Sequence, residues 1–357
     1  MKYLVKFRPL EPYTFGTDQT FEYPERGREG KTGKESYFVL SGTVPAQTTI
    51  LGALRYLALK HRDYLHTDFH YDNLSKVQET VGPESFSFDA EAPQQFGVIH
   101  SVSPLFLSRG ERVLIRNPFH NRAGDNGYRP MRLTGEIWTS HGEIALPAKD
   151  EYKAKEGCAG GYIDIESKAV YGDDRIFRSV TLPGNQKTSD AENRAYYRRQ
   201  MISLSPGYEF AVYVDAAPDA FPADSVAYMG QKRAAFRVTA APFATDEPGT
   251  AAEILERQVR AAFADGSEPW FYALSPLRIP SGTAFKSFCI VEETSQRNLT
   301  TDYKAPTPIH KLKRSTVRYN LVRAGSVFHS ARPEIPPGQN CQTIGYNSVV
   351  QLGGELS

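Results

Sequence analysis

The sequence predicts an α+β fold built from two domains. A chain of 357 residues is longer than most single domains. Apolar segments of strand length and two amphipathic helical segments follow one another as strand, helix and two strands, then as two strands and a helix. This order suggests a repeated α+β unit. We expect the first domain to span residues 1–160 and the second residues 161–357.

The first elements are expected to be a strand, a loop and a helix. Residues 3–7 are apolar enough for an opening strand, whereas residues 20–34 are polar, charged and glycine-containing, as in a surface loop. A helix is expected to begin at Thr48, whose hydroxyl can cap it. Four apolar residues then recur on one helical face: Leu51, Leu54, Leu57 and Ala58. This face should pack on a sheet.

The middle of the chain gives a less regular pattern. Residues 96–107 and 112–115 are apolar and β-branched around a glycine-containing turn, which predicts paired strands. Residues 117–129 form a basic stretch rich in glycine and asparagine, typical of a loop. Residues 153–190 sustain neither the helical nor the strand period, so no element is predicted there. Residues 191–201 are assigned as a short basic helix.

The second half repeats the mixture of strands and one helix. Residues 208–214 and 232–239 predict strands, and residues 250–264 predict a helix. The apolar face of this helix consists of Ile254, Leu255, Val259 and Phe263. Further strands are expected at residues 270–274, 285–292 and 318–322, before a glycine-containing tail at residues 338–354.

Composition limits what the protein can bind and where it works. The 42 Lys and Arg and 41 Asp and Glu leave a net charge of +1, so any nucleic-acid site must be a local basic surface. Cys158, Cys289 and Cys341 lie far apart, which fits a reducing compartment and favours neither zinc nor disulfides. No uncharged apolar stretch approaches membrane-spanning length. We expect a cytoplasmic protein without a membrane segment, metal or cofactor.

The histidines give little support to catalysis. His66 and His70 could share a helical face with Asp63 as metal ligands, but no further ligand follows at a diagnostic spacing, and a polar helix end explains them better. His310 can act as a general base in RNA cleavage or simply contact RNA or solvent. No G-x-S-x-G or H-E-x-x-H motif is found in the sequence. We therefore expect no enzymatic activity.

The strongest local basic feature is the segment of residues 303–333. It contains no Asp or Glu and seven cationic residues, namely Lys304, Lys311, Lys313, Arg314, Arg318, Arg323 and Arg332. Phosphate binding needs such clustering, and Tyr319 and Phe328 offer rings on which bases can stack. A solvated basic face or a protein interface explains the segment equally well.

Glycine turns near cations supply further candidates for phosphate contact. Glycine lets backbone amides approach a phosphate closely, although a plain turn is the commoner use. Together with the basic segment, they give the candidates Gly230, Lys232, Arg233, Arg237, Arg318, Arg323, Gly325, Ser326 and Gly345. We expect the turn with Lys232 and Arg233 to converge with the turn after Arg323 on one binding face.

Six short segments occur along the chain in the order of one protein family. They are PLEP with FG in residues 9–16, YFVLS at 37–41, PAQTTILGALRY at 45–56, YMGQKR at 228–233, AGSVF at 324–328 and IGY at 344–346. Together they resemble the third subunit of the type III-B Cmr complex, a CRISPR effector complex, within the RAMP superfamily. The fourth segment departs from the family's Gly-Gly-Glu-x-Arg turn at Met229 and Gln231.

The resemblance implies a fold and a role. The fold is two ferredoxin-like (RRM-like) domains with inserted loops, without a catalytic centre. The role is to bind the repeat-derived 5′ tag of the guide RNA, to dock on the large polymerase-type subunit, and to join the backbone RAMP subunits in antiviral defence. Two alternatives stay open: an endoribonuclease of the same superfamily that processes CRISPR RNA, and a protein scaffold without direct RNA contact.

The third of these segments adds candidates on the first helix. A helix that begins near Thr48 and Thr49 presents unpaired amides and the positive end of its dipole to a phosphate. Gly52 permits close approach, and Arg55 is a bidentate donor. Close packing of Gly52 on a sheet is an equally good explanation, and on either account Gly52→Val is expected to damage folding or assembly.

Overall fold

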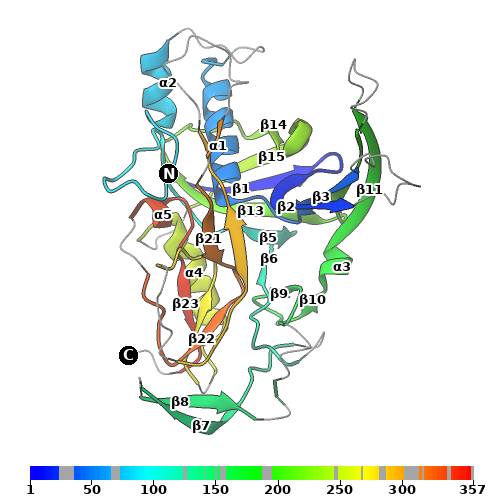
Figure 1. Cartoon of the computed structure of the whole chain (residues 1–357). Coiled ribbons are helices and arrows are strands. Elements are labelled where there is room, and N and C mark those ends of the chain that lie inside the picture. The colour runs from blue at the N-terminus through cyan, green and yellow to red at the C-terminus, as the bar shows by residue number, and fades with distance from the viewer. Residues whose placement is uncertain are drawn as a thin grey trace, which may run out of the picture.

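The computed structural model is a mixed α+β structure dominated by sheets, which confirms the α+β class (Figure 1). It describes residues 1–23, 36–65, 73–123, 127–140, 142–148, 151–152, 158–186, 195–244, 248–266, 268–280, 287–300, 313–315, 317–335 and 339–354. No helix among these residues is long and apolar enough to span a bilayer. The three cysteines are free thiols.

A central sheet organises the molecule. Its members are β1 (Lys2–Pro9), β4 (Ile99–Val102), β5 (Phe106–Arg109), β6 (Arg112–Arg116), β9 (Tyr162–Asp164), β10 (Val170–Tyr171), β13 (Tyr208–Ala216), β14 (Asp224–Met229) and β15 (Ala234–Pro242). The order is β10, β9, β6, β5, β13, β1, β15, β14, and β4 also pairs with β13. The first strand of the chain therefore lies between two strands from its second half.

The pairing of β1 bears on the expected domain boundary. Tyr3 lies opposite Val214 of β13, and Val5 lies opposite Ala240 of β15, both in antiparallel register. The central sheet thus takes strands from both sides of residue 160. The division into residues 1–160 and 161–357, and the ferredoxin-like character of each part, stay predictions.

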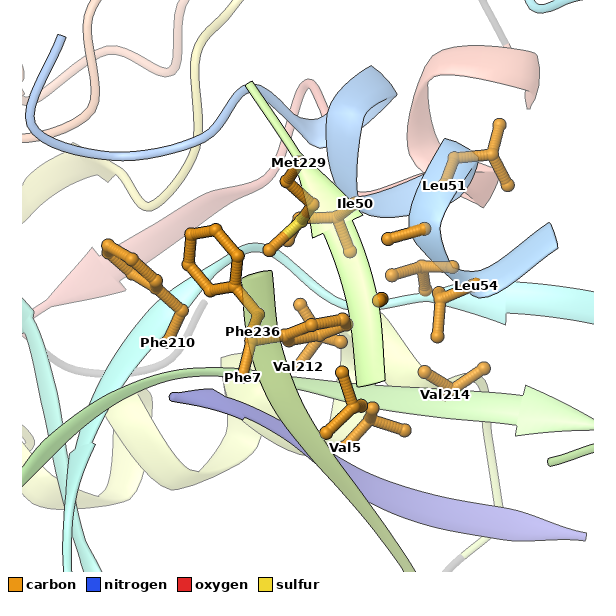
Figure 2. Packing of buried hydrophobic residues seen from close by; sticks show 14 of the residues in the cluster. Val5, Phe7, Ile50, Leu51, Leu54, Phe210, Val212, Val214, Met229 and Phe236 are labelled. Atoms are coloured by element: carbon orange, nitrogen blue, oxygen red, sulfur yellow. The ribbon is translucent and has the colours of Figure 1, made fainter. Parts of the chain in front are cut away.

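Helix α1 (Gln47–His61) covers one face of this sheet. Its residues Ile50, Leu51 and Leu54 share one core with side chains from four sheet strands, β1, β13, β14 and β15. Figure 2 shows them in one cluster of buried side chains with Val5, Phe7, Phe210, Val212, Val214, Met229 and Phe236. Ala46 occupies the N-cap without a side-chain hydrogen bond. A cap contributes about 1 kcal/mol, whereas each buried leucine contributes about 2 kcal/mol, so packing rather than capping holds α1.

Helix α4 (Ala251–Ala262) packs on the opposite face of the sheet. Side chains alternate along β13, so Val212 and Val214 join the α1 core while Ala211 and Tyr213 join the α4 core. A second sheet lies beyond α4, with the order β17 (Cys289–Ile290), β22 (Val327–His329), β16 (Trp270–Ala273) and β23 (Val349–Leu352). Trp270 and Tyr272 of β16 are buried in the α4 core.

The remaining elements lie around these layers. A third sheet has the order β11 (Phe177–Gln186), β12 (Ala195–Leu204), β3 (Ser36–Gly42) and β2 (Phe15–Tyr23). Three two-stranded sheets pair β7 (Leu133–Thr139) with β8 (Gly142–Pro147), β18 (Glu293–Gln296) with β21 (Tyr319–Val322), and β19 (Leu299–Thr300) with β20 (Lys313–Arg314). The short helices are α2 (Leu74–Val81), α3 (Asp173–Ile176) and α5 (Gln339–Thr343).

Three local predictions need correction. Thr48 is not the cap of α1, because the helix begins at Gln47 and Thr48 lies inside it. Residues 20–23 belong to strand β2 rather than to a loop, because they pair with β3. Residues 195–201, part of the predicted basic helix, belong to strand β12, which pairs with β11 over ten residues and with β3 over three.

Candidate nucleic-acid interface

The exposed face of α1 carries four side chains and one bare position. Thr49, Arg55 and Tyr56 are partly exposed, and Gly52 and Lys60 are fully on the surface. A Cβ atom at Gly52 would find no heavy atom within 4 Å. Of the two explanations for Gly52, close packing on a sheet is therefore ruled out among the described residues. The helix turns its leucines inward and leaves the glycine open to the outside.

The turn between β14 and β15 holds an unusual backbone. Gly230 has φ of 74°, and a Cβ at this position would lie 2.5 Å from the Thr14 carbonyl oxygen. Lys232 and Arg233 also adopt left-handed values of φ, 60° and 55°. For residues other than glycine this conformation costs about 1–3 kcal/mol each, and such strain concentrates at binding sites. The backbone amide of Gln231 donates to the Thr14 carbonyl over 2.8 Å, which anchors the turn.

This turn lies against the exposed face of α1. The ring of Tyr228, at the end of β14, meets the ring of Tyr56 edge to face at 6.3 Å between centroids. Burial and Tyr228 raise the pKa of Tyr56, and the nearby positive charge of Arg233 opposes that rise. The Lys60 ammonium lies 5.9 Å from the centre of the Tyr56 ring. Cations and aromatic rings from two distant parts of the sequence therefore share one surface.

We call this the α1–turn surface. Its members are Thr49, Gly52, Tyr56, Lys60, Tyr228, Gly230, Lys232 and Arg233. Its chemistry suits a single-stranded nucleic acid, because aromatic rings can stack on bases while exposed cations contact phosphates. The sequence interpretation missed Tyr56, Lys60 and Tyr228. The spacing of four residues from Gly52 to Tyr56 and from Tyr56 to Lys60 is the signal that could have found the first two.

The start of α1 is held by the C-terminal part of the chain. The buried Gln47 side chain donates to the carbonyls of Ser103, at 2.8 Å, and Ile344, at 2.9 Å. Gly345 is buried directly against this side chain. The side-chain amide of Gln296, on β18, donates to the Thr48 hydroxyl over 2.9 Å. Gly345 therefore supports the helix rather than facing outward, and Thr48 is engaged within the chain.

Arg318 is exposed immediately before strand β21. This exposed residue donates from Nη2 to the Ser295 hydroxyl over 3.2 Å. Ser295 precedes Gln296, which reaches Thr48 as described above and lies opposite Tyr319 in the β18–β21 ribbon. Because successive side chains on a strand alternate, Ser295 and Gln296 point to opposite faces of this ribbon, so these contacts do not place Arg318 on the α1–turn surface. Lys304, Lys311 and His310 of the basic segment, like His66 and His70, lie outside the described residues.

The second glycine turn lies elsewhere. Arg323 forms an ion pair with Glu292 at 2.8 Å. Gly325 packs against Phe119 and against Arg116, the last residue of β6. The Gly325 carbonyl accepts a hydrogen bond from the Phe119 backbone amide over 2.9 Å. Ser326 is completely buried, so its hydroxyl belongs to no exposed surface. Gly325 and Ser326 therefore have packing roles, and the half-exposed Arg323 is engaged in its ion pair with Glu292.

The expected convergence of the two glycine turns is therefore wrong. β6 and β15 are four places apart in the order of the central sheet. At about 4.8 Å per strand, this separates the two turns by roughly 20 Å. Arg323 and Lys232 do not form one local site.

Two predicted arginines are engaged in contacts within the chain. Arg55 donates to the Glu84 carbonyl over 2.9 Å, and its guanidinium lies 5.3 Å from the centre of the Phe96 ring. Arg237 donates to both carboxylate oxygens of Asp224, which raises the pKa of Arg237 and lowers the pKa of Asp224. Its neighbours Phe236 and Val238 point into the α1 core, so Arg237 lies on the opposite face of the sheet.

Comparison with known proteins identifies the family. The family model described as CRISPR-associated protein (Cas_Cmr3) matches residues 6–317. The chain belongs to the Cas_Cmr3 family. This confirms the resemblance found in the sequence. No curated protein sequence matches the chain.

Solved structures from type III CRISPR complexes are similar over the whole length at low identity. A chain in the cryo-EM structure of the type III-B Cmr-beta bound to cognate target RNA is 12% identical, with a TM-score of 0.46, over 99% of this chain and 98% of that chain. A chain of the Csm1-Csm4 cassette in complex with cA4 is 12% identical, with a TM-score of 0.33, over 99% and 95%. A chain in the crystal structure of the Csm3-Csm4 subcomplex in the type III-A CRISPR-Cas interference complex is 9% identical, with a TM-score of 0.35, over 100% of this chain and 100% of that chain.

Proposed function

We propose that the protein is a non-catalytic RNA-binding subunit of a type III-B CRISPR effector complex. In this role it binds the 5′ tag of the guide RNA through the α1–turn surface. It also docks on the large polymerase-type subunit and contacts the backbone RAMP subunits. Membership of the Cas_Cmr3 family supports the placement in a CRISPR complex. The contacts with the tag and the partners are the proposal.

The observation that carries the RNA contact is the bare position on α1. Glycine within a helix costs about 1 kcal/mol relative to alanine, and the chain gains no packing at Gly52 in return. Close approach by another molecule is the use that such a position offers. Lys232 and Arg233 are exposed on the neighbouring turn, and Tyr56 and Tyr228 supply rings between the two elements. A phosphate and a base could thus be bound together.

The proposal is tested by RNA affinity over a salt series. The probe is single-stranded RNA with the repeat-derived 5′ tag, and the protein is the full chain bound to the large partner subunit. Lys232→Ala and Arg233→Ala are each expected to weaken binding across all RNA sequences. The slope of log affinity against log salt should become shallower by about 0.7 for each lost phosphate contact.

Arg260→Ala is the matched control. Arg260 is an exposed arginine on α4, on the opposite face of the central sheet. It should keep the parent affinity and salt slope. If Lys232→Ala and Arg233→Ala, both folded, behave like this control, the α1–turn surface is not the RNA site and the scaffold alternative gains support.

The same RNA separates binding from cleavage. Incubation with repeat RNA should leave the RNA intact, because we propose no catalytic role. Among the described residues, no three His, Cys, Asp or Glu side chains gather as metal ligands would. Specific product that survives repurification of the protein would favour the endoribonuclease alternative.

A further inference from the structure

The β7–β8 hairpin stands apart from the layers of the molecule. Figure 1 shows it at the bottom of the view, away from the central sheet. Within the described residues β7 and β8 pair only with each other. Trp138 is 77% exposed and Ile137 is 47% exposed. The two side chains are consecutive on β7 and therefore lie on opposite faces of the hairpin. An isolated two-stranded hairpin is marginally stable in water, so cover over its exposed indole ring would stabilise it.

One face of the hairpin combines an indole ring with two carboxylates. Trp138 lies directly opposite Glu143, and Glu136 lies opposite Ala145. Because side chains alternate along a strand, Glu136, Trp138 and Glu143 share this face. The two carboxyl groups are close enough for Glu143, when protonated, to donate a hydrogen bond to Glu136, which raises the pKa of Glu143. When both groups are ionised, two like charges lie side by side next to an exposed ring.

The hairpin itself cannot neutralise this pair. Residues 133–147 contain Glu136 and Glu143 but no Lys or Arg. Among the described residues neither carboxylate takes part in an ion pair. Both carboxylates repel phosphate, so a nucleic acid is a poor occupant. A cation relieves the repulsion, and an arginine does more than a lysine, because its planar fork can bind two carboxylates while it stacks on an indole ring.

We propose that the Glu136–Trp138–Glu143 face docks an arginine side chain presented by the surface of another protein. The guanidinium stacks on Trp138 and donates to both carboxylates. The charge complementarity selects a basic protein surface over RNA or an acidic one. This inference goes beyond the proposed RNA contact and does not depend on it, because the hairpin and the α1–turn surface share no residue.

Site-specific cross-linking in the assembled complex tests the proposal. A benzophenone amino acid replaces Ser140, an exposed residue beside the face, and the complex is purified through the full chain. Cross-links should map to a protein segment that contains an arginine. Trp138→Ala and the pair Glu136→Gln with Glu143→Gln should each reduce the yield of this product about tenfold. Ile137→Thr, on the other face of the hairpin, should keep it.

A charge exchange then identifies the arginine. Glu136→Lys with Glu143→Lys should abolish the cross-link, and an Arg→Glu substitution at the mapped partner site should restore it. Cross-linking to RNA, to a second copy of this chain or to a segment without arginine would overturn the proposal, as would no cross-link or one that none of the substitutions reduces. RNA affinity should stay unchanged in Trp138→Ala, which separates this result from the fate of the proposed function.

Discussion

Gly52 and Gly345 lie near the same helix in opposite surroundings. A Cβ at Gly52 meets nothing within 4 Å, whereas one at Gly345, where φ is 85°, would collide with the Gln47 side chain and the Ser103 carbonyl. Gly345→Ala should therefore lower the free energy of unfolding by about 2 kcal/mol or more. Gly52→Ala should raise it by up to about 1 kcal/mol. Urea unfolding of both variants measures the contrast, and equal effects would contradict it.

The open position also changes the expectation for Gly52→Val. Valine in an exposed helix is no worse than glycine, so folding should be preserved and only binding should suffer. Loss of tag-RNA affinity at unchanged stability would locate the effect in the interface. Damaged folding would instead assign Gly52 a structural role.

His120 is a buried titratable residue that links stability to pH. Its ring stacks on Trp270 at 4.4 Å, and its Nε2 lies 2.8 Å from the Tyr128 hydroxyl. Burial, with Arg122 and His329, lowers its pKa to about 3. Because the unfolded pKa is about 6.5, the unfolded state binds the extra proton between these values. Stability should be complete above about pH 6.5 and fall as the pH decreases.

One substitution can show that His120 causes this loss of stability at low pH. His120→Phe keeps a ring against Trp270 and cannot titrate. Between pH 7 and pH 5 the wild type should lose about 2 kcal/mol more of its free energy of unfolding than the variant. The measurement is urea unfolding of both proteins at the two pH values. Parallel losses would mean that His120 stays neutral in the unfolded chain as well or titrates in the folded one.

At the scale of elements, α4 begins with a capping box formed by Thr250 and Glu253. Thr250 accepts from the Glu253 amide, and the Glu253 carboxylate accepts from the Thr250 amide over 2.6 Å. Thr250→Ala removes one of these bonds and should cost about 1 kcal/mol. Thr181→Ala, on the exposed strand β11, is the control and should change stability by less than about 0.5 kcal/mol. Thermal or urea unfolding tests both.

The same helix shows which elements the sequence could predict. Its apolar spacing and its capping residue are local, so residues 250–264 predicted α4 correctly. Strand β12 could not be predicted in this way, because its conformation depends on ten pairings with β11 and three with β3. Local propensity is a weak guide where distant pairing decides.

The residues of the candidate site also divide into those that local sequence could predict and those that depend on tertiary structure. Lys232 and Arg233 were found because a glycine and cations adjoin in sequence, and they lie on an exposed turn. Ser326, Gly345 and Arg237 were also chosen because glycines or cations adjoin in sequence. In the fold, Ser326 and Gly345 are buried, and Arg237 forms an ion pair with Asp224. A sequence pattern does not reveal which face of a sheet a side chain occupies when the neighbouring strands are unknown. The meeting of Tyr56 with Tyr228 is likewise a product of tertiary structure.

At the scale of the whole molecule, the central sheet bears on the predicted division at residue 160. Cutting there would separate β1 from both of its neighbours, β13 and β15. Each buried strand would then expose unpaired backbone groups and core side chains. Residues 1–160 and 161–357 expressed alone should therefore show no cooperative unfolding, and their co-expression should restore it. A sharp thermal transition in either fragment alone would support two independent domains.

The position of β1 also has a consequence during synthesis on the ribosome. Val5 and Phe7 leave the ribosome long before β13, the strand that pairs with β1, because β13 begins only at Tyr208. At ~5–20 residues per second, the nascent chain waits roughly 10–40 s for that partner. Throughout this interval the apolar strand β1 lacks both of its sheet partners, β13 and β15. Translation speed and holdase chaperones should therefore control the yield, and protease sensitivity of β1 in stalled nascent chains would reveal when it becomes protected.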